Sequence, residues 1–426
     1  MEKPKPKPLE LHMIHEFRVE GLVAAVFTPF HENGQLNLDL IDKYVDHLHK
    51  SQITNIFVCG CTGEGMSLSV DERKLVAKKW ISSGREKLDK IIIQVGAHNL
   101  EDSKDLAAHA QEIGADAIAS LPSLFFKPNT IDDLIDYCKE IANQASDTPF
   151  YYYHLPALTG VTFDMEDFFR GARKRIPTLR GVKFSDANFD MVCGVMEMDS
   201  MKYGEFEVFC GNDLLYLGAM ALGIEWAVGS TYNFMPRVVH RMVEAFNRGD
   251  IHQAKLEQRR IQDVIRVRNK YEQLQAGQHA TRPTHGKTVA ETKEFMPLIG
   301  LDMGPPRLPL KPLSNDLREQ FRKDLENIGF FTWIQERVSS VSSPVRSPSL
   351  DQSSGAPVKK RMLSRGTSLL TSDSDEPSTP PPHDHHGTHE LPHSTYTPPH
   401  HSSSAESKRT SFEHHGHSNS ITLLTE

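Results

Sequence analysis

The sequence predicts a closed (β/α)8 TIM barrel with extra C-terminal helices, followed by a disordered tail. Eight short, apolar, strand-like runs alternate with longer amphipathic segments between about residues 17 and 250. Strands that alternate with helices form parallel βαβ units. Eight such units suit a closed barrel better than an open sheet, because a barrel of this type takes about 250 residues.

The expected elements follow one another at short intervals. In chain order the strands are Gly21–Phe27, Ile56–Val58, Lys90–Val95, Ala117–Ser120, Pro149–Tyr153, Gly181–Phe184, Glu207–Cys210 and Trp226–Val228. Apolar residues at helical spacing predict helices over residues 36–51 and 70–83. Three later stretches of the same kind, at residues 251–274, 289–299 and 315–328, predict an additional helical layer.

Composition divides the chain into four parts. Residues 1–16 form a Lys/Pro-rich N-terminal arm without the apolar stretch of a secretory signal. We assign residues 17–250 to the barrel, 251–337 to the C-terminal helical layer and 338–426 to a tail rich in Ser, Pro and His. The tail lacks apolar periodicity, so it cannot bury enough surface to offset its ordering entropy and we expect disorder.

The tail carries its own signals. Basic residues precede Ser364 and Ser368, and Ser347 is followed by proline, which predicts kinases as partners of the tail. Its clustered histidines can bind a metal weakly or stay solvated, and the lack of a fixed scaffold favours solvated low complexity.

Charge and cysteine usage narrow the class of protein. The net charge of −8 gives no basic surface for nucleic acid. No run of about 18 apolar residues is present, so we expect no membrane span. Five scattered cysteines predict reduced thiols rather than a disulfide framework, so we expect a cytoplasmic protein.

Lys183 is the first candidate for chemistry, since catalytic groups of such barrels lie at the C-terminal ends of the strands. It stands near the end of the sixth expected strand. A lysine inside a barrel loses hydration, which lowers the pKa of its ammonium group, and the neutral amine can attack a ketone. A lysine at a strand end that points to solvent is the alternative.

Tyr153 ends the fifth expected strand, within a run of three tyrosines. A phenol beside a substrate can transfer protons. Alternation places Tyr151 and Tyr153 on the same face, so the pattern does not choose between them. His154 follows as a candidate general base or as a packed histidine.

Glycine-rich or polar turns follow three other strands. The turn Gly60–Gly65 can bind a carboxylate through its backbone amides and the Thr62 hydroxyl, or it can be an ordinary turn. The turns at 211–213 and 229–233 can bind hydroxyl groups, or simply start helices.

Together these segments resemble one family. The ordered motifs Gly60-Cys-Thr-Gly-Glu64, Tyr153-His-Leu-Pro156, Gly181-Val-Lys-Phe-Ser185 and Gly229-Ser-Thr-Tyr-Asn233 resemble the N-acetylneuraminate lyase branch of the dihydrodipicolinate synthase family. The similarity covers about residues 17–335 and includes the segment Met303–Pro309. It implies a homotetramer that needs neither metal nor organic cofactor.

The resemblance also implies residue roles. Lys183 matches the lysine that forms a Schiff base with the substrate, and Tyr153 matches the tyrosine that transfers protons. The substrate-binding positions are Cys61 and Thr62 at the keto-acid carboxylate, and Ser185, Gly211, Asp213 and Ser230 at the sugar part. The implied reaction is the cleavage of N-acetylneuraminate to N-acetylmannosamine and pyruvate.

The chain departs from the family pattern in three places. Cys61 replaces a serine or threonine whose hydroxyl assists the tyrosine. Leu214 stands where sialic acid lyases carry an acidic residue that holds the glycerol tail. Phe125 and Phe126 stand where bacterial members offer a tyrosine across a subunit interface.

Other functions are alternatives for the same sequence. A dihydrodipicolinate synthase would need an arginine shortly after the Tyr–Pro turn, and Ala157–Val161 contains none. Another pyruvate-forming aldolase, acting on 4-hydroxy-2-oxoglutarate or on a modified sialic acid, is an alternative because of Leu214. A barrel that serves as a scaffold regulated through its tail is a second alternative, although Lys183 and Tyr153 argue against lost chemistry.

Overall fold

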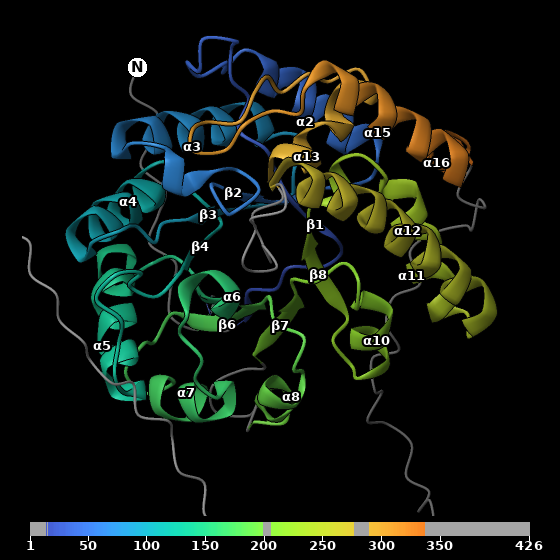
Figure 1. Ribbon diagram of the computed structural model, residues 1–426. Helices are drawn as coiled ribbons and strands as arrows, with labels where there is room; N and C mark the ends of the chain where they lie inside the picture. Colours follow the sequence, from blue (N-terminus) through green and yellow to red (C-terminus); the bar gives the residue numbers. More distant parts are fainter. Residues whose placement is uncertain (1–13, 15, 199–205, 277–288, 337–426) are drawn as a thin grey trace, which may run out of the picture. The chain divides into compact units, whose positions relative to one another are not determined.

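Eight parallel strands close into a barrel, with the strands in chain order and β1 paired to β8 (Figure 1). The computed structural model describes Ile14 and residues 16–198, 206–276 and 289–336. The strands are β1 (Val23–Ala25), β2 (Asn55–Val58), β3 (Lys90–Gln94), β4 (Ala117–Ser120), β5 (Phe150–His154), β6 (Leu179–Phe184), β7 (Glu207–Cys210) and β8 (Trp226–Gly229). The predicted TIM-barrel fold is confirmed.

Helices lie outside the strands and connect them (Figure 1). Those of the barrel are α2 (Leu40–Lys50), α3 (Val70–Gly84), α4 (Leu100–Glu112), α5 (Ile131–Ala142), α6 (Pro156–Thr159), α7 (Met165–Ala172), α8 (Asp190–Met196), α10 (Tyr216–Ala221) and α11 (Pro236–Asn247). Short 3-10 turns are η1 (Gly65–Ser67), η2 (Asn143–Ala145) and η3 (Thr231–Asn233). Helix α3 begins with a capping box between Ser69 and Glu72, which explains why it starts at that point.

Two predicted helices differ from the observed ones. The first begins at Leu40 rather than at residue 36, because Leu36 forms an antiparallel bridge with Phe30. The stretch 289–299 divides into two short helices, α13 (Val289–Lys293) and α14 (Phe295–Leu298). Pro297 has no N–H to donate to the carbonyl of Lys293, so one continuous helix loses that bond.

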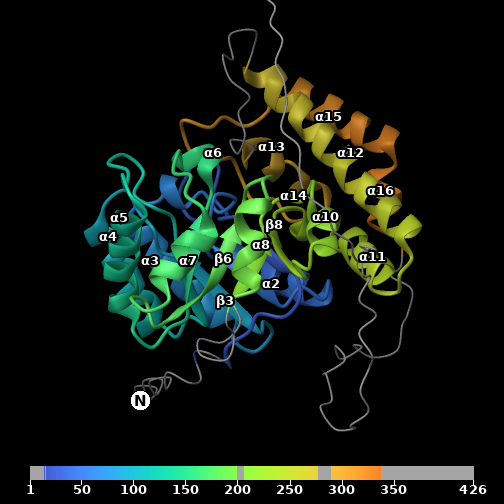
Figure 2. The same cartoon turned by 90° about the horizontal axis from the view of Figure 1, so that it is seen from below.

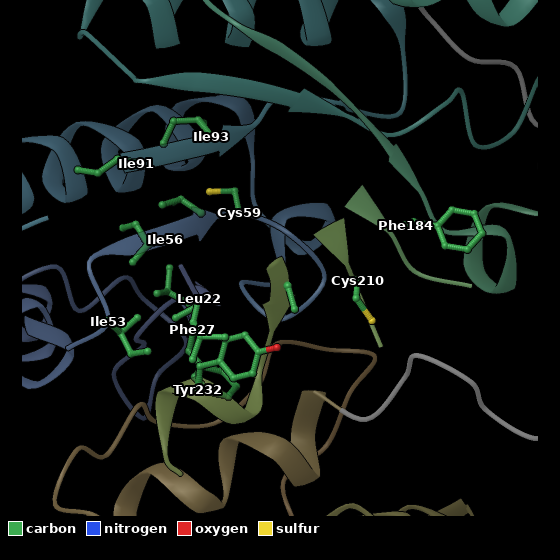
Figure 3. Packing of buried hydrophobic residues seen from close by; sticks show 14 of the residues in the cluster. Leu22, Phe27, Ile53, Ile56, Cys59, Ile91, Ile93, Phe184, Cys210 and Tyr232 are labelled. Carbon is green, nitrogen blue, oxygen red and sulfur yellow. The ribbon is translucent and has the colours of Figure 1, made fainter. Parts of the chain in front are cut away.

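The strands alternate between two apolar environments. Inward-facing residues such as Val23, Phe57, Tyr151 and Phe209 fill the barrel interior. Outward-facing residues pack beneath the helices, and Figure 3 shows a part of this layer: Leu22, Phe27, Ile53, Ile56, Cys59, Ile91, Ile93, Phe184, Cys210 and Tyr232. The period of two along each strand therefore decides which side chains can reach a site inside the barrel.

A C-terminal helical layer covers one side of the barrel (Figure 2). Besides α13 and α14 it contains α12 (Ile251–Ala276), α15 (Asn315–Ile328) and α16 (Phe330–Trp333). Tyr271 of α12 packs edge-on against Phe321 of α15, with ring centroids 5.2 Å apart. Gln258 of α12 donates its amide to the carbonyl oxygen of Asp213 at 3.0 Å, which ties this layer to the end of β7.

The predicted tail lies outside the described residues, as do the predicted kinase sites, the histidine clusters and nearly all of the predicted N-terminal arm. No helix in the described part of the chain combines the length and apolar character that crossing a membrane requires.

Candidate active site

Lys183 lies inside the barrel near the C-terminal end of β6. Only 5% of the residue is exposed. Its Nζ lies 4.1 Å from the centroid of the Phe57 ring and 3.9 Å from that of the Tyr153 ring. The solvent-facing alternative for this lysine is therefore wrong.

The surroundings of Lys183 favour its neutral amine. Burial lowers the pKa of Lys183 to about 7, although the nearby Cys61 and Asp213 act in the opposite direction. A substantial fraction of the amine is therefore uncharged at neutral pH and able to attack a carbonyl carbon.

The register of β5 distinguishes the two inward tyrosines. Tyr153 is paired with Lys183 across the β5–β6 ladder. Tyr151 lies deeper, where its hydroxyl donates to Glu207, which also accepts the Val19 N–H at 2.9 Å. Tyr151 thus belongs to the barrel floor, and Tyr153 alone of the two lies beside the lysine.

Tyr153 is a neutral phenol in this environment. Burial raises its pKa, the nearby Cys61 adds to that rise, and a side-chain hydrogen bond with Ser185 opposes it. An iminium on Lys183 would place a positive charge beside the phenol and lower the pKa of Tyr153 again.

His154 packs on the outer face of the barrel. Its ring stacks on Phe184 at a centroid distance of 5.0 Å and is fully buried. Burial lowers the pKa of His154 to about 4. The residue faces away from Lys183, so the packed alternative describes it and the general-base alternative does not.

The turn Gly60–Gly65 follows β2 and lies directly beside Lys183. A side-chain carbon at Gly60 would lie 4.0 Å from the Lys183 Nζ and 2.8 Å from the Phe57 ring. Cys61 and Thr62 are half-buried on this turn. Burial raises the pKa of the Cys61 thiol, so the group stays protonated. The turn thus brings Thr62 and backbone amides to the mouth that Lys183 faces.

Ser185 and Gly211 lie together at the ends of β6 and β7. A side-chain carbon at Gly211 would lie 2.0 Å from the Ser185 Oγ, so only glycine leaves room for that hydroxyl. Ser185 also meets Tyr153 through the hydrogen bond described above.

Asp213 and Ser230 lie at the ends of β7 and β8. Asp213 accepts the Thr231 N–H at 3.1 Å, and burial raises the pKa of its carboxyl group. A side-chain carbon at Gly229 would meet the Asp213 Oδ1 at 2.1 Å. Ser230 is half-buried and precedes η3. The structure therefore gathers all the predicted site residues around one barrel mouth.

Three further residues contribute to this mouth and were not predicted. Phe57 forms one wall beside Lys183, and alternation along its strand could have indicated this. Glu64 is buried within the predicted turn. Arg268 of α12 acts electrostatically on Asp213 and Cys61, and nothing in the local sequence pattern indicates this.

The positions that depart from the family pattern differ in environment. Leu214 is partly buried against the main core, and its carbonyl accepts amide protons of Gln258 and Gln262, both at 3.2 Å. Phe125 and Phe126 are 82% and 85% exposed and pack edge-on against each other at 5.0 Å.

A closed parallel barrel with a buried lysine and tyrosine at the C-terminal ends of its strands is the architecture of a TIM-barrel enzyme. Residues 18–328 match the model of the dihydrodipicolinate synthetase family. The chain belongs to this family, and it is an enzyme.

Named relatives narrow the branch. N-acetylneuraminate lyase of Homo sapiens is 42% identical over 318 residues, which is 74% of this chain and 94% of the relative. N-acetylneuraminate lyase A of Xenopus laevis is 44% identical over 297 residues, covering 69% of this chain and 91% of the relative. The predicted resemblance to the N-acetylneuraminate lyase branch is confirmed.

Two solved structures of N-acetylneuraminate lyases are also similar to this chain in fold and sequence. The N-acetylneuraminate lyase of Proteus mirabilis superposes with a TM-score of 0.67 at 33% identity, over 74% of this chain and all of that one. The sialic acid aldolase of Aliivibrio salmonicida gives the same TM-score at 35% identity, over 74% of this chain and 98% of its own.

Proposed function

We propose that this protein is a Schiff-base (class I) aldolase that cleaves N-acetylneuraminate to N-acetylmannosamine and pyruvate. The observation that carries the proposal is the buried Lys183 amine between the Phe57 and Tyr153 rings. Membership of the N-acetylneuraminate lyase branch supports the choice of substrate.

Imine formation comes first. The neutral Lys183 amine attacks C2 of the open-chain keto acid. The Tyr153 phenol then gives its proton to the departing C2 hydroxyl, so that water leaves and an iminium forms beside the Tyr153 phenolate. The substrate carboxylate binds the amides of the Gly60–Gly65 turn and the Thr62 hydroxyl. The iminium then serves as the electron sink for cleavage.

Carbon–carbon cleavage follows. The C4 hydroxyl loses its proton to the Tyr153 phenolate, or to the substrate carboxylate with Tyr153 as relay. The C3–C4 bond breaks, its electrons form an enamine on Lys183, and the C4 carbon leaves as the aldehyde of N-acetylmannosamine. Tyr153 then returns the proton to C3 of the enamine, and water adds to the resulting iminium and releases pyruvate, which regenerates the Lys183 amine and the Tyr153 phenol. No metal or organic cofactor takes part in this scheme.

The sugar part lies toward the ends of β6, β7 and β8. Ser185, Gly211, Asp213 and Ser230 supply hydroxyl, backbone and carboxylate groups there. We propose a cytoplasmic homotetramer, in which the exposed Phe125 and Phe126 face a partner subunit.

A second candidate substrate is a modified sialic acid or another aldol such as 4-hydroxy-2-oxoglutarate. Leu214 favours this alternative, because its apolar side chain offers no hydrogen bond to a glycerol tail. The catalytic steps at Lys183 would be the same.

Turnover with defined substrates tests the proposal. Purified protein is incubated with N-acetylneuraminate, an O-acetylated sialic acid or 4-hydroxy-2-oxoglutarate, and both products are quantified. We expect N-acetylneuraminate to give equimolar pyruvate and N-acetylmannosamine with the highest kcat/KM, and Lys183→Ala to give none. Equal release by Lys183→Ala, or a preference for either other substrate, would overturn the proposal or its choice of substrate.

A further inference from the structure

The segment Met303–Pro309 packs against the polypeptide that supports the Gly60–Gly65 turn. The Phe30 N–H donates to the Met303 carbonyl oxygen at 2.9 Å. Gly304 has φ of +67°, and a side-chain carbon there would lie 2.0 Å from the Phe30 oxygen. Only glycine permits this close approach, so the motif is shaped to dock at this place.

Glu64 connects the turn to the C-terminal helical layer through both of its carboxylate oxygens. Its Oε1 accepts from the Lys293 Nζ of α13 at 2.9 Å, and its Oε2 accepts the Arg307 N–H at 2.8 Å. The side chains of Glu64 and Lys293 are only 1% and 3% exposed. Desolvation offsets much of the attraction in a buried ion pair, so such a pair is weak evidence for stability and fits a positional role better.

The backbone of the turn needs such support. Glu64 has φ of +52°, a conformation that residues other than glycine adopt only when their surroundings impose it. Gly65 packs so closely that a side-chain carbon would lie 2.0 Å from the Cys59 oxygen. Thr28 fixes the opposite side of the turn by donating its hydroxyl to the Gly63 carbonyl oxygen at 2.7 Å.

The Arg307 side chain adds contacts to the residues that follow the turn. We call the contacts that Lys293 and Arg307 make with Glu64 and with these residues the clasp. It donates to both carboxylate oxygens of Glu72, at 2.6 and 2.5 Å, and to the Ser67 carbonyl oxygen at 3.2 Å. Lys293 also donates to the Pro305 carbonyl oxygen at 3.2 Å. Lys293 and Arg307 thus hold residues on both sides of Gly65, the last glycine of the turn. Glu64 precedes this glycine, and Ser67 and Glu72 follow it.

We propose that Lys293 and the Arg307 backbone are positioning groups for the active site, which hold Glu64 so that the Gly60–Gly65 turn presents its amides and Thr62 to the keto-acid carboxylate. This inference rests on the proposed function, because it assigns the turn to carboxylate binding. The C-terminal helical layer is then part of the substrate-binding apparatus, although neither Lys293 nor Arg307 touches the substrate.

Loss of the clasp should weaken keto-acid binding and leave the chemistry of Lys183 intact. Borohydride trapping of pyruvate on the full-length protein measures both properties. The half-saturating pyruvate concentration reports keto-acid binding, and the maximal trapping rate reports the chemistry of Lys183. In Lys293→Met we expect the half-saturating pyruvate concentration to rise about 10-fold or more and the maximal trapping rate to change less than about 3-fold. Lys293→Arg keeps the charge and should restore most of the affinity.

Arg241→Met is the matched control. Arg241 forms a buried ion pair with Glu257, with Nε and Oε1 2.9 Å apart, which joins α11 to α12 away from the turn. Its loss should lower the melting temperature and leave the half-saturating pyruvate concentration within about 2-fold of wild type. If Lys293→Met does not fold, Glu64→Gln is measured in the same way, with a rise of about 5-fold expected.

Two results would overturn the inference. One is an unchanged half-saturating concentration in Lys293→Met, or in Glu64→Gln where that variant replaces it. The other is an equal rise in Arg241→Met, which would reveal only a general loss of stability. Failure of the proposed function is distinguishable, because wild-type protein would then give no adduct at Lys183 at any pyruvate concentration.

Discussion

Tyr153 and Lys183 are register partners on neighbouring strands, and the Lys183 Nζ lies 3.9 Å from the centroid of the Tyr153 ring. The pairing places a proton-transfer group and a nucleophile at the same height of the barrel. The same strand carries Tyr151 one layer deeper, against Glu207. Two chemically identical side chains thus have separable roles, which mutation can test.

Tyr153→Phe should abolish most activity and leave stability nearly unchanged. The ring would still pack against Phe57 and Lys183, but no hydroxyl would remain for proton transfer, which is worth about 10²–10⁴-fold in rate. Tyr151→Phe should show the opposite pattern, since a lost hydrogen bond to the half-buried carboxylate of Glu207 costs about 1.5–3 kcal/mol of unfolding free energy. Turnover assays and denaturant unfolding of both variants test this, and similar kcat losses in the two would contradict it.

Imine formation should depend on pH with a midpoint near 7. The pKa of Lys183 is lowered to about 7, so the reactive neutral amine predominates above that pH and the protonated form below it. The rate of borohydride trapping with pyruvate should therefore rise as pH increases through 7 and level off above about 8. A rate that keeps rising toward pH 10 would show that the amine is not desolvated.

Cys61→Ser should raise kcat. A thiol is a weak hydrogen-bond donor, and Cys61 stays protonated because burial raises its pKa. A serine hydroxyl in its place should assist Tyr153 better, and we expect an increase of about 3- to 10-fold. Cys193→Ser changes a half-buried cysteine of α8 and serves as the control. An unchanged or lower kcat in Cys61→Ser would sink the idea.

Leu214→Glu should improve the use of N-acetylneuraminate. A charged hydrogen bond to the glycerol tail is worth about 1.5–3 kcal/mol, so KM should fall by about 10- to 100-fold. Leu214→Gln, which has the same length without the charge, should recover only part of this. If neither variant lowers KM and another 2-keto acid is cleaved better by the wild type, the natural substrate lacks a sialic acid glycerol tail.

Much of the fold could be predicted from local patterns, because parallel strands buried on both faces form short apolar runs. Two of the strands, β4 and β7, have the predicted bounds. Closure of the barrel could not be derived this way, since periodicity does not report which strand pairs with β1. The break before α14 was missed because Pro297 acts on a carbonyl four residues earlier.

The sequence predicted the contacts of the candidate active site less completely than it predicted the fold. Alternation along β5 left Tyr151 and Tyr153 equivalent, and only the pairing with β6 separates them. Arg268 and Lys293 belong to the C-terminal helical layer, far along the chain from the residues that they influence at the barrel mouth and the Gly60–Gly65 turn. Local spacing in the sequence therefore could not predict their contribution to the site. The resemblance to a family provided the order of the motifs but not these contacts.

Covalent trapping tests the central claim most directly. The protein is incubated with pyruvate and borohydride, its intact mass is measured, and the modified peptide is mapped. We predict a single reduced pyruvate adduct on Lys183 in the wild type and none in Lys183→Ala. An adduct on another lysine, or no adduct while the protein still cleaves its substrate, would contradict the Schiff-base account.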